Sequence, residues 1–377
     1  MKIDIVKESR KAESRVAATP EVVKKLNEKL PNSDILVEKS AGKAANIPDK
    51  DFEAAGAKIA TPKQAWEADV VIKVNPPTET EAAKLKKGAL LVALMEPYNN
   101  DKLLKLLAKN GVHAVALESV PRTSRAQSMD VLSSQANIAG YRAVLEATQH
   151  LNRFMPLMMT AAGSAKAARV MVLGAGVAGL QAIATARRLG AVVEAFDVRP
   201  EVAEQIESLG AKFIDLDIGE TASGEGGYAK ELSAEGKKKQ QAALQEYLKK
   251  ADVVVTTAQI PGKKAPILVT KNALKGMSSG SVVVDMAAAT GGNVEGSEAD
   301  KIKQVEGVTV VGVTNYPALM AKDASLFFGR NVVNLLGLFA DVNAEKKKTT
   351  LKFDLDDDII AGCLAVYDGK VRFGSEK

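Results

Sequence analysis

Cysteine, histidine and tryptophan are scarce in this chain. Its 377 residues include one cysteine, Cys363, two histidines, His113 and His150, and one tryptophan. A single cysteine excludes a disulfide framework and a cysteine-ligated metal cluster. His113 lies in an apolar run that is typical of a strand, and His150 lies in a predicted helix. Neither histidine has a ligand partner at metal-site spacing, so we expect no metal site.

A strong charge of one sign and long apolar runs are also lacking. The formal net charge is +5, the basic residues are scattered, and only 4% of residues are aromatic. Binding of nucleic acid would need a basic patch interleaved with aromatic side chains, so we expect no nucleic-acid partner. The charged N-terminus is not a signal peptide, and no apolar run reaches the length of a bilayer span. These absences predict a cytoplasmic chain without membrane insertion of its own.

Strand and helix signals alternate along most of the sequence, which favours an α/β fold with parallel sheets. Thr19 and Pro20 mark the start of a helix that ends near Leu30. The strands predicted for a first domain are residues 2–6, 35–37, 70–73, 89–94 and 113–116, and those for a second domain are 169–173, 191–196, 253–256, 282–285 and 308–311.

We expect two Rossmann-like, doubly wound parallel-sheet domains joined by long helices, with NAD bound in the cleft. The first domain comprises residues 1–135 plus 315–377, and the NAD-binding domain comprises residues 136–314. The long helices are predicted at about Ser133–Arg153 and Ser325–Phe339. Terminal strands near Leu351–Phe353 and Cys363–Val366 are expected to rejoin the first domain, with Cys363 in its core.

Residues 170–197 contain the most informative motif. The strand Val170–Leu173 leads into Gly174-Ala-Gly176-Val-Ala-Gly179, an apolar helix and a second strand that ends at Asp197. The first glycine allows a sharp turn, the second lets a pyrophosphate touch the backbone, and the third allows close helix packing. The N-terminus of the helix then attracts phosphates. The alternative is a tight strand–helix turn without a ligand.

Asp197 and Arg199 give opposite signals about the cofactor. An acid at the end of the second strand bonds both hydroxyls of an adenosine ribose and repels a 2′-phosphate. An arginine two residues later can accept that phosphate. Because Asp197 sits at the tip of the strand, the sequence favours NAD(H) over NADP(H).

Two loops are further candidates for the site. Residues 120–141 are dense in hydrogen-bonding groups, and Arg122, Gln127, Asp130 and Ser133 could hold the nicotinamide carboxamide and its ribose. The alternative is a helix-start loop whose polar groups satisfy its own backbone. Residues 219–239 are rich in glycine, glutamate and lysine. They predict either a solvated surface loop or a mobile lid over the cofactor, with Tyr228 closing down.

The run Pro121-Arg-Thr-Ser-Arg-Ala-Gln-Ser-Met-Asp-Val-Leu-Ser-Ser-Gln135 resembles the NAD(H)-binding domain I, within the alpha subunit, of proton-translocating NAD(P) transhydrogenase. Gly140-Tyr-Arg-Ala-Val144, Gly226-Gly-Tyr-Ala-Lys230 and Ile260-Pro-Gly262 resemble it too. The segment Arg15-Val-Ala-Ala-Thr-Pro20 is shared with the related alanine dehydrogenases. The resemblance covers essentially the whole chain.

This resemblance implies an oxidoreductase and translocase subunit that acts as a homodimer. It would bind NADH and pass hydride directly to NADP+ held on a partner domain, coupled to proton movement through a membrane-spanning subunit. The chain would then be cytoplasmic and peripheral to the inner (plasma) membrane through these partners.

The resemblance also implies roles for particular residues. Arg122, Gln127, Asp130 and Ser133 match the nicotinamide end, and Gln127 would also reach the NADP+. Asp197 matches the adenosine-ribose acid, and Tyr228 matches the mobile-loop tyrosine. The remaining cofactor contacts expected from sequence are Tyr141, Gly174, Gly176, Val177, Ala178, Gly179, Val198, Arg199, Gly227, Ala258 and Gln259.

The alternative function is that of an NAD-dependent alanine dehydrogenase. Reduction of an imino acid needs a proton donor, which in that family is a histidine after about the fourth strand. The matching stretch Ala89–Met95 has no histidine, and Ala289 stands where that family places a second acid. Arg15 and Lys73 do match its substrate-carboxylate binders, or they pair with Glu8 and other acids. Hydride exchange between two nicotinamides needs no protein proton donor, which favours the transhydrogenase.

Overall fold

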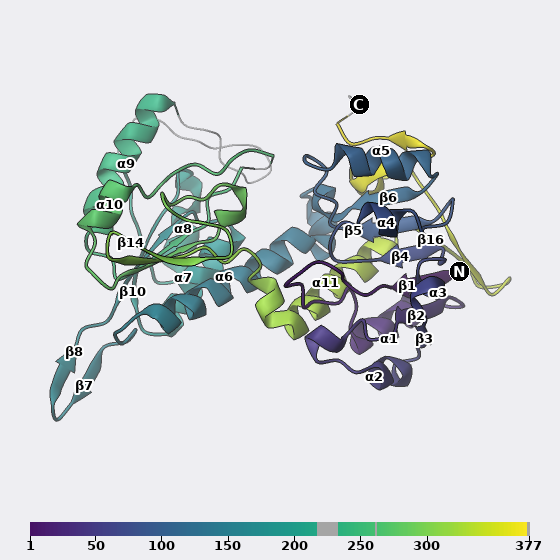
Figure 1. The fold of residues 1–377 in the computed structure, drawn as a ribbon, viewed down its shortest axis with the longest axis horizontal. Helices are drawn as coiled ribbons and strands as arrows, with labels where there is room; N and C mark the ends of the chain where they lie inside the picture. Colours follow the sequence, from purple (N-terminus) through teal and green to yellow (C-terminus); the bar gives the residue numbers. More distant parts are fainter. Residues whose placement is uncertain (217–232, 261, 375–377) are drawn as a thin grey trace. The chain divides into compact units, whose positions relative to one another are not determined.

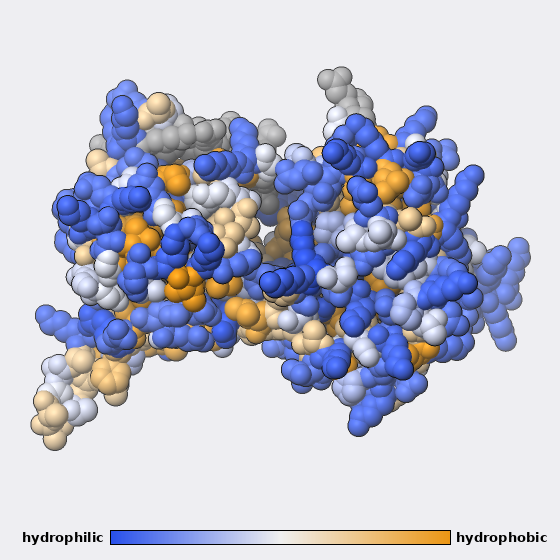
Figure 2. Space-filling model, in the orientation of Figure 1, coloured by the Kyte–Doolittle hydropathy of each residue, from blue (hydrophilic) through white to orange (hydrophobic). Residues whose placement is uncertain are grey.

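The computed structural model describes residues 1–216, 233–260 and 262–374. The chain divides into two compact units: unit 1 comprises Met1–Gln135 and Pro317–Lys377, and unit 2 comprises Ala136–Tyr316 (Figure 1). Each unit contains one large, mostly parallel sheet. The visible surface of each is mostly hydrophilic (Figure 2) because helices enclose the apolar faces of such sheets. The predicted class, a two-domain α/β fold with parallel sheets, is confirmed.

Unit 1 is built on an eight-stranded sheet of order β19-β18-β6-β5-β4-β1-β2-β3. The strands from β6 to β3 run parallel, whereas β18 is antiparallel to β6 and β19 is antiparallel to β18. Their bounds are β1 (Lys2–Ile5), β2 (Asp34–Glu38), β3 (Lys58–Ala60), β4 (Val70–Ile72), β5 (Leu90–Ala93), β6 (His113–Ala116), β18 (Leu364–Tyr367) and β19 (Lys370–Val371).

Short capping signals start several helices of unit 1. The Thr19 hydroxyl accepts a hydrogen bond from the Val22 N–H at 3.4 Å, and Pro20 takes the first helical position. Thr61 and Thr78 begin capping boxes before α3 and α4. The helices and 3-10 turns are α1 (Pro20–Lys29), η1 (Lys43–Ala45), α2 (Asp49–Ala54), α3 (Pro62–Ala65), α4 (Glu79–Ala82), α5 (Asp101–Lys109), η2 (Leu117–Ser119), η3 (Ser124–Met129), η7 (Pro317–Met320), α11 (Ala321–Leu336) and α12 (Asp358–Cys363).

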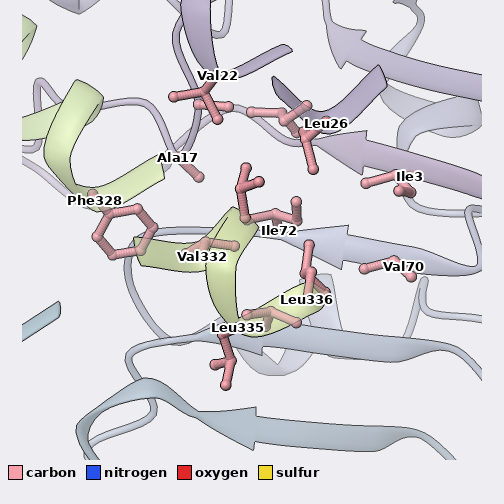
Figure 3. Close-up of a cluster of buried hydrophobic side chains, with 14 of the residues drawn as sticks. Ile3, Ala17, Val22, Leu26, Val70, Ile72, Phe328, Val332, Leu335 and Leu336 are labelled. Atoms are coloured by element: carbon pink, nitrogen blue, oxygen red, sulfur yellow. The ribbon is translucent and has the colours of Figure 1, made fainter. Parts of the chain in front are cut away.

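Alternate residues of the unit 1 strands enter two separate cores, one on each face of the sheet. On one face α11 supplies buried apolar side chains that gather with α1 and the strands. Figure 3 shows this cluster, including Ile3, Val22, Leu26, Val70, Ile72, Phe328, Val332, Leu335 and Leu336. On the other face Val71 and Leu91 pack with Trp66 and with α5. Burial on both faces explains why β4 and β5 are continuous apolar runs.

Unit 2 contains a seven-stranded sheet of order β11-β10-β9-β12-β13-β15-β14. Its first six strands follow the 3-2-1-4-5-6 order of a Rossmann sheet, and β14 adds an antiparallel edge. The strands are β9 (Arg169–Leu173), β10 (Val192–Phe196), β11 (Lys212–Phe213), β12 (Val253–Thr256), β13 (Val282–Asp285), β14 (Ile302–Val305) and β15 (Val308–Val311).

The helices of unit 2 follow its strands, as the alternation of the sequence predicts. Helix α6 (Val131–His150) carries the chain from unit 1 into unit 2. The others, with the 3-10 turns, are α7 (Val177–Arg188), η4 (Pro200–Val202), α8 (Ala203–Ser208), α9 (Ala234–Leu248), α10 (Lys271–Gly276) and η6 (Ala288–Thr290). Among the helices of the described residues, none combines the length and the hydropathy that crossing a bilayer requires.

A separate hairpin extends away from the rest of unit 2 (Figure 1). It consists of β7 (Met158–Thr160) and β8 (Gly163–Ala165), which pair antiparallel. Figure 2 shows apolar surface along this arm. The Met159 side chain is 78% exposed, and Phe154 and Leu157 before the hairpin are also exposed. The sequence analysis did not predict this element.

Two expectations for the C-terminal segment are wrong. Residues near Leu351–Phe353 do not join the large sheet, because β17 (Lys348–Leu351) pairs with β16 (Ala340–Asn343) in a separate two-stranded sheet. Cys363 is the last residue of α12 rather than a strand residue, since Asp357 caps that helix. Cys363 is nevertheless buried as predicted, and β18 does join the sheet of unit 1.

Asp4 is a carboxylic acid enclosed in the sheet of unit 1. It lies on β1, opposite Leu36 of β2 and Val71 of β4, and it is 0% exposed. Neither carboxyl oxygen makes a hydrogen bond of ordinary geometry with the described residues. Burial and the nearby Glu38 carboxylate raise the pKa of Asp4 to about 8, and the Ile5 N–H offsets only part of this. Asp4 is therefore mostly neutral in the folded chain at pH 7.

The substitution Asp4→Asn tests this burial through the pH dependence of stability. The folded pKa of about 8 lies above the unfolded value of 3.8, so this group's contribution to stability falls as pH rises between them. Asn has the same shape and no such titration. We expect the free energy of unfolding of unit 1, followed by fluorescence of its lone Trp66, to favour the variant by at least about 1 kcal/mol more at pH 8 than at pH 5. A difference between variant and wild type that does not change with pH would contradict the assignment.

Candidate functional site

The glycine-rich turn between β9 and α7 is held by contacts that leave no room for side chains. Gly174 has a φ of +101°, and a Cβ there would lie 2.5 Å from the Thr257 hydroxyl oxygen. That hydroxyl donates to the Gly174 carbonyl at 3.0 Å. A Cβ on Gly179 would lie 1.9 Å from the same carbonyl. The sharp turn and the close packing predicted for these two glycines are therefore present in the structure.

Gly176 differs from its two neighbours because the space beside it is open. A Cβ at Gly176 would meet no described atom within 4 Å. Gly176 is the N-cap of the twelve-residue helix α7, where no side chain among the described residues caps the N–H groups. Val177 and Ala178 form the first turn of this helix. The arrangement offers free N–H groups and backbone access to an anion, as a pyrophosphate requires.

Asp197 directly follows β10 and is buried. Its Oδ2 accepts from the Ala175 N–H at 2.7 Å, which ties the acid to the glycine-rich turn. Arg199 donates to the same carboxylate through its main-chain N–H, its Nε and its Nη2, each at 2.9 Å. These bonds raise the pKa of Arg199. The arginine that the sequence offered as a partner for a 2′-phosphate is thus engaged by Asp197.

The loop after β12 is fixed by a buried amide. Asn293 accepts from the Ala258 N–H at 3.1 Å and donates through Nδ2 to the Ala258 carbonyl at 2.9 Å. The Asn293 N–H in turn donates to the buried Asp285 carboxylate at 3.1 Å. Gln259 is exposed, and its Nε2 donates to the Met286 carbonyl at 3.1 Å. The Ala258 backbone therefore has a defined position, with the amide of Gln259 beside it at the surface.

These residues lie along one edge of the unit 2 sheet. Strands β10, β9 and β12 are parallel neighbours, so the segments that follow them meet at their carboxyl ends. The predicted cofactor residues at this edge are Gly174, Gly176, Val177, Ala178 and Gly179 after β9, Asp197, Val198 and Arg199 after β10, and Ala258 and Gln259 after β12. Dinucleotides bind at this edge of a Rossmann sheet, where the strand order reverses.

Tyr141 reaches the same part of unit 2 through a close helix contact. It lies on α6 beside Gly140, where a Cβ would be 2.0 Å from the Ala178 carbonyl oxygen. A backbone approach this close is possible only for glycine. It brings the helix that carries Tyr141 against the first turn of α7.

The predicted loop of unit 1 has two kinds of polar residue. Asp130 accepts from the Ser133 N–H at 2.8 Å and from the Ser133 hydroxyl at 2.6 Å, so both residues serve the start of α6. This confirms the alternative in which they satisfy the helix's own backbone. Arg122 and Gln127, by contrast, have exposed side chains. The binding roles of all four residues stay predictions.

Arg15 and Lys73 are paired with buried acids in unit 1. The Lys73 Nζ lies 3.0 Å from Glu8 Oε2, and the Arg15 Nη2 lies 2.7 Å from Glu13 Oε2. Asn75 donates to both carboxylates, at 3.0 and 2.9 Å. Burial would raise the pKa of Glu13, but Arg15 and Asn75 lower it to about 2. The predicted pairing with acids is confirmed, and an anionic substrate would have to compete with two carboxylates for these cations.

The candidate lid is only partly described. Gly227 and Tyr228 lie outside the described residues, so their predicted roles stay predictions. The boundary expected near residue 239 is wrong, because α9 already begins at Ala234. Ser233 caps this helix by accepting from the Gly236 N–H at 3.0 Å, and the helix-forming residues that follow override the single glycine.

The sequence analysis missed two residues that shape the site. Thr257 locks the glycine-rich turn through its hydroxyl, and Asn293 locks the loop after β12. Each follows a signal that was present in the sequence: Thr257 comes at the end of an apolar strand, and Asn293 comes directly after Gly291-Gly292. A polar residue just beyond the carboxyl end of a buried strand is a candidate for such a role.

Comparisons with known proteins agree with this architecture. The family model for the alanine dehydrogenase/PNT N-terminal domain matches residues 4–139, and that for the C-terminal domain matches residues 143–374. A Rhodospirillum rubrum protein, the first of the separate chains that make up its NAD(P) transhydrogenase subunit alpha, is 47% identical over 380 residues. That match covers 98% of this chain and 97% of the relative.

A solved transhydrogenase structure from Sinorhizobium meliloti has 43% sequence identity and a TM-score of 0.85, and the match covers 98% of both chains. Alanine dehydrogenase 1 of Staphylococcus aureus is more distant, with 28% identity over 381 residues that cover 98% of this chain and 94% of the relative. The resemblance inferred from sequence motifs, including the greater distance to alanine dehydrogenase, is confirmed.

Two glycine substitutions separate the fold of the site from its binding. Gly179→Ala places a methyl group on the Gly174 carbonyl, and we expect it to destabilise the chain by roughly 1–3 kcal/mol in urea unfolding. Gly176→Ala meets open space, so we expect near-normal stability but at least a roughly tenfold weaker affinity for NADH, equivalent to about 1.4 kcal/mol. Fluorescence titration measures the affinity. Normal NADH affinity in a folded Gly176→Ala variant would show that no ligand approaches this backbone.

Proposed function

Because the chain belongs to the alanine dehydrogenase/PNT family, we propose that it is the NAD(H)-binding subunit of a proton-translocating NAD(P) transhydrogenase. In this role it holds NADH while hydride passes directly to NADP+ on a partner domain. The partner domain and a membrane-spanning subunit couple this transfer to proton movement. The chain itself is cytoplasmic and lies at the inner (plasma) membrane through those partners.

The observation that carries this proposal is a dinucleotide-binding edge without a histidine to act as acid or base. His113 is on β6, with its ring centroid 4.8 Å from that of Phe353, and its Nδ1 accepts from the Asp368 N–H at 3.3 Å. Burial lowers its pKa. His150 is near the end of α6, beside Glu146. Reduction of an imino acid needs a proton donor, whereas transfer between nicotinamides does not.

The end of β5 gives the same indication. In the rival family this region supplies the histidine, but here β5 is four buried apolar residues followed by Met95 and Glu96. The Glu118 carboxylate accepts from the Met95 and Glu96 N–H groups, so it fixes the turn. Burial raises the pKa of Glu118, although these N–H groups lower it in part. Its oxygens already serve the backbone of this turn.

NAD(H) rather than NADP(H) is the nucleotide that unit 2 favours. The ribose acid Asp197 is held in place by the Ala175 N–H and by Arg199. A 2′-phosphate would approach a carboxylate whose neighbouring arginine is already bound to it. Repulsion of that phosphate supports discrimination against NADPH. The NADP+ therefore belongs to the partner domain.

The unit 1 loop supplies the groups at the nicotinamide end in this proposal. Arg122 and Gln127 offer exposed hydrogen-bonding side chains, while Asp130 and Ser133 anchor the loop at the start of α6. None of these groups exchanges a proton with substrate. Their part is to orient one nicotinamide so that its C4 lies about 3–3.5 Å from that of the second.

The exposed hairpin of unit 2 supports the proposed homodimer. Phe154, Leu157 and Met159 expose apolar side chains on or beside a two-stranded arm. An isolated two-stranded hairpin is marginal in water, and a second copy of the chain would cover its apolar residues.

A paired assay on the purified chain tests the proposed function. We expect tight NADH binding, no alanine formed from pyruvate and ammonium, and NADH oxidation by NADP+ only when an isolated transhydrogenase NADP(H)-binding domain is added. Alanine formation by the chain alone would support the alanine dehydrogenase alternative. Tight NADH binding with no hydride transfer to the added domain would reject both enzymatic functions.

The homodimer is tested by sedimentation at micromolar concentration. We expect the wild-type chain at twice its monomer mass and a Leu157→Asp/Met159→Asp variant at the monomer mass, because charges on the arm prevent its burial. The matched control is Val192→Asp, which changes an exposed residue of β10. A monomeric wild type, or a hairpin variant that remains dimeric, would contradict this assignment.

A further inference from the structure

We infer that the ion pair between Arg125 and Asp357 is a positioning device for hydride transfer, an inference that rests on the proposed function. Arg125 lies in η3, between Arg122 and Gln127. Asp357 lies more than 200 residues later, at the N-cap of α12. Both belong to unit 1. The pair therefore ties the nicotinamide loop to the C-terminal segment of its own unit.

The geometry of this pair is more restrictive than that of an ordinary surface ion pair. The Arg125 Nη1 lies 2.7 Å from Asp357 Oδ2, and its Nη2 lies 2.8 Å from Oδ1. The same Nη2 also contacts Asp358. Two parallel bonds between a planar guanidinium and a carboxylate define an orientation as well as a distance.

Asp357 is itself held rigidly at the start of α12. Its Oδ1 accepts from the Ile359 and Ile360 N–H groups at 2.9 and 3.2 Å. The Arg125 guanidinium lowers the pKa of Asp357 to about 2, and the helix N–H groups act in the same direction. The carboxylate is thus ionised at physiological pH, and it offers Arg125 a fixed anchor.

A second contact holds the other end of η3. The Ser128 carbonyl accepts from Asn331 and Asn334 of α11, at 2.8 and 3.1 Å. Ala126 and Met129 are buried in the core of unit 1. The loop is therefore fixed on both sides of Gln127, by Arg125 toward α12 and by Ser128 toward α11. Gln127 itself is left exposed.

This anchoring matters because hydride transfer depends steeply on geometry. A displacement of about 1 Å at a site where reacting atoms must meet can cost roughly a hundredfold in rate. Asp197 and the glycine-rich turn belong to unit 2. Loss of the Arg125 anchor should thus slow the transfer step while NADH affinity stays close to normal. A residue needed only for folding would not separate these two quantities.

The test uses the full chain with an isolated transhydrogenase NADP(H)-binding domain. The variants are Arg125→Ala, Asp357→Asn and the double variant; Asn is chosen because it remains a good helix N-cap. The matched control is Arg330→Ala: Arg330 is an arginine of similar exposure, 41% against 48%, that pairs with Glu21. Single-turnover hydride transfer and NADH fluorescence are measured separately, and circular dichroism monitors folding.

We expect each single variant to lower the transfer rate roughly tenfold or more, with NADH affinity within about twofold of wild type. The double variant should be no slower than the worse single variant, because both act through one pair. Arg125→Lys should recover only a fraction of the rate, since an ammonium cannot make the paired bonds. Arg330→Ala should match wild type.

A wild-type transfer rate in a folded Arg125→Ala variant would overturn the inference. So would multiplicative losses in the double variant, because they would show that the two residues act separately. If the variants do not fold, the partial recovery expected for Arg125→Lys decides the matter. An inactive wild type would instead reject the proposed function, so the two failures remain distinct.

Discussion

The contact between Gly179 and the Gly174 carbonyl is the constraint on which the site in unit 2 depends. A Cβ at Gly179 would lie 1.9 Å from that carbonyl oxygen, so α7 can begin against β9 only if this residue is glycine. The same carbonyl accepts the Thr257 hydroxyl from the neighbouring segment after β12. Ala175 in this turn donates to Asp197, which follows β10. One tight turn thus sets the relation of three strand ends.

Unit 1 positions its candidate residues by a different means. Its loop lacks a glycine-rich turn, and it is held by side chains that come from distant regions of the sequence. Arg125 reaches α12, and the Ser128 carbonyl reaches α11. The cations Arg15 and Lys73 are neutralised within the same unit by Glu13 and Glu8. In our account this unit orients the nicotinamide and supplies no proton donor.

Periodic and local features were predictable from the sequence. The apolar strands β12, β13 and β15 lie where the apolar runs predicted them, because they are buried on both faces. The fingerprint from Gly174 to Asp197 was readable for a related reason, since each of its elements acts over a short range.

Long-range features were not predictable in this way. The bonds from Asp357 to Arg125 and from Asn293 to Ala258 join residues that only tertiary folding brings together. Cys363 was assigned to a strand because its apolar run continues from a helix into β18 without a break. The residues expected to bind cofactor could be placed on the structure, whereas their binding is inferred from chemistry and from resemblance.

The central claim is that hydride passes directly from one nicotinamide to another, without exchange with protein or water. The most direct measurement uses NADH with deuterium at both C4 positions, NADP+ and the partner NADP(H)-binding domain in ordinary water. Mass spectrometry of the NADPH formed then reports the origin of the transferred hydrogen. The account predicts one deuterium in every NADPH molecule. NADPH that carries solvent hydrogen in place of the label would contradict direct transfer.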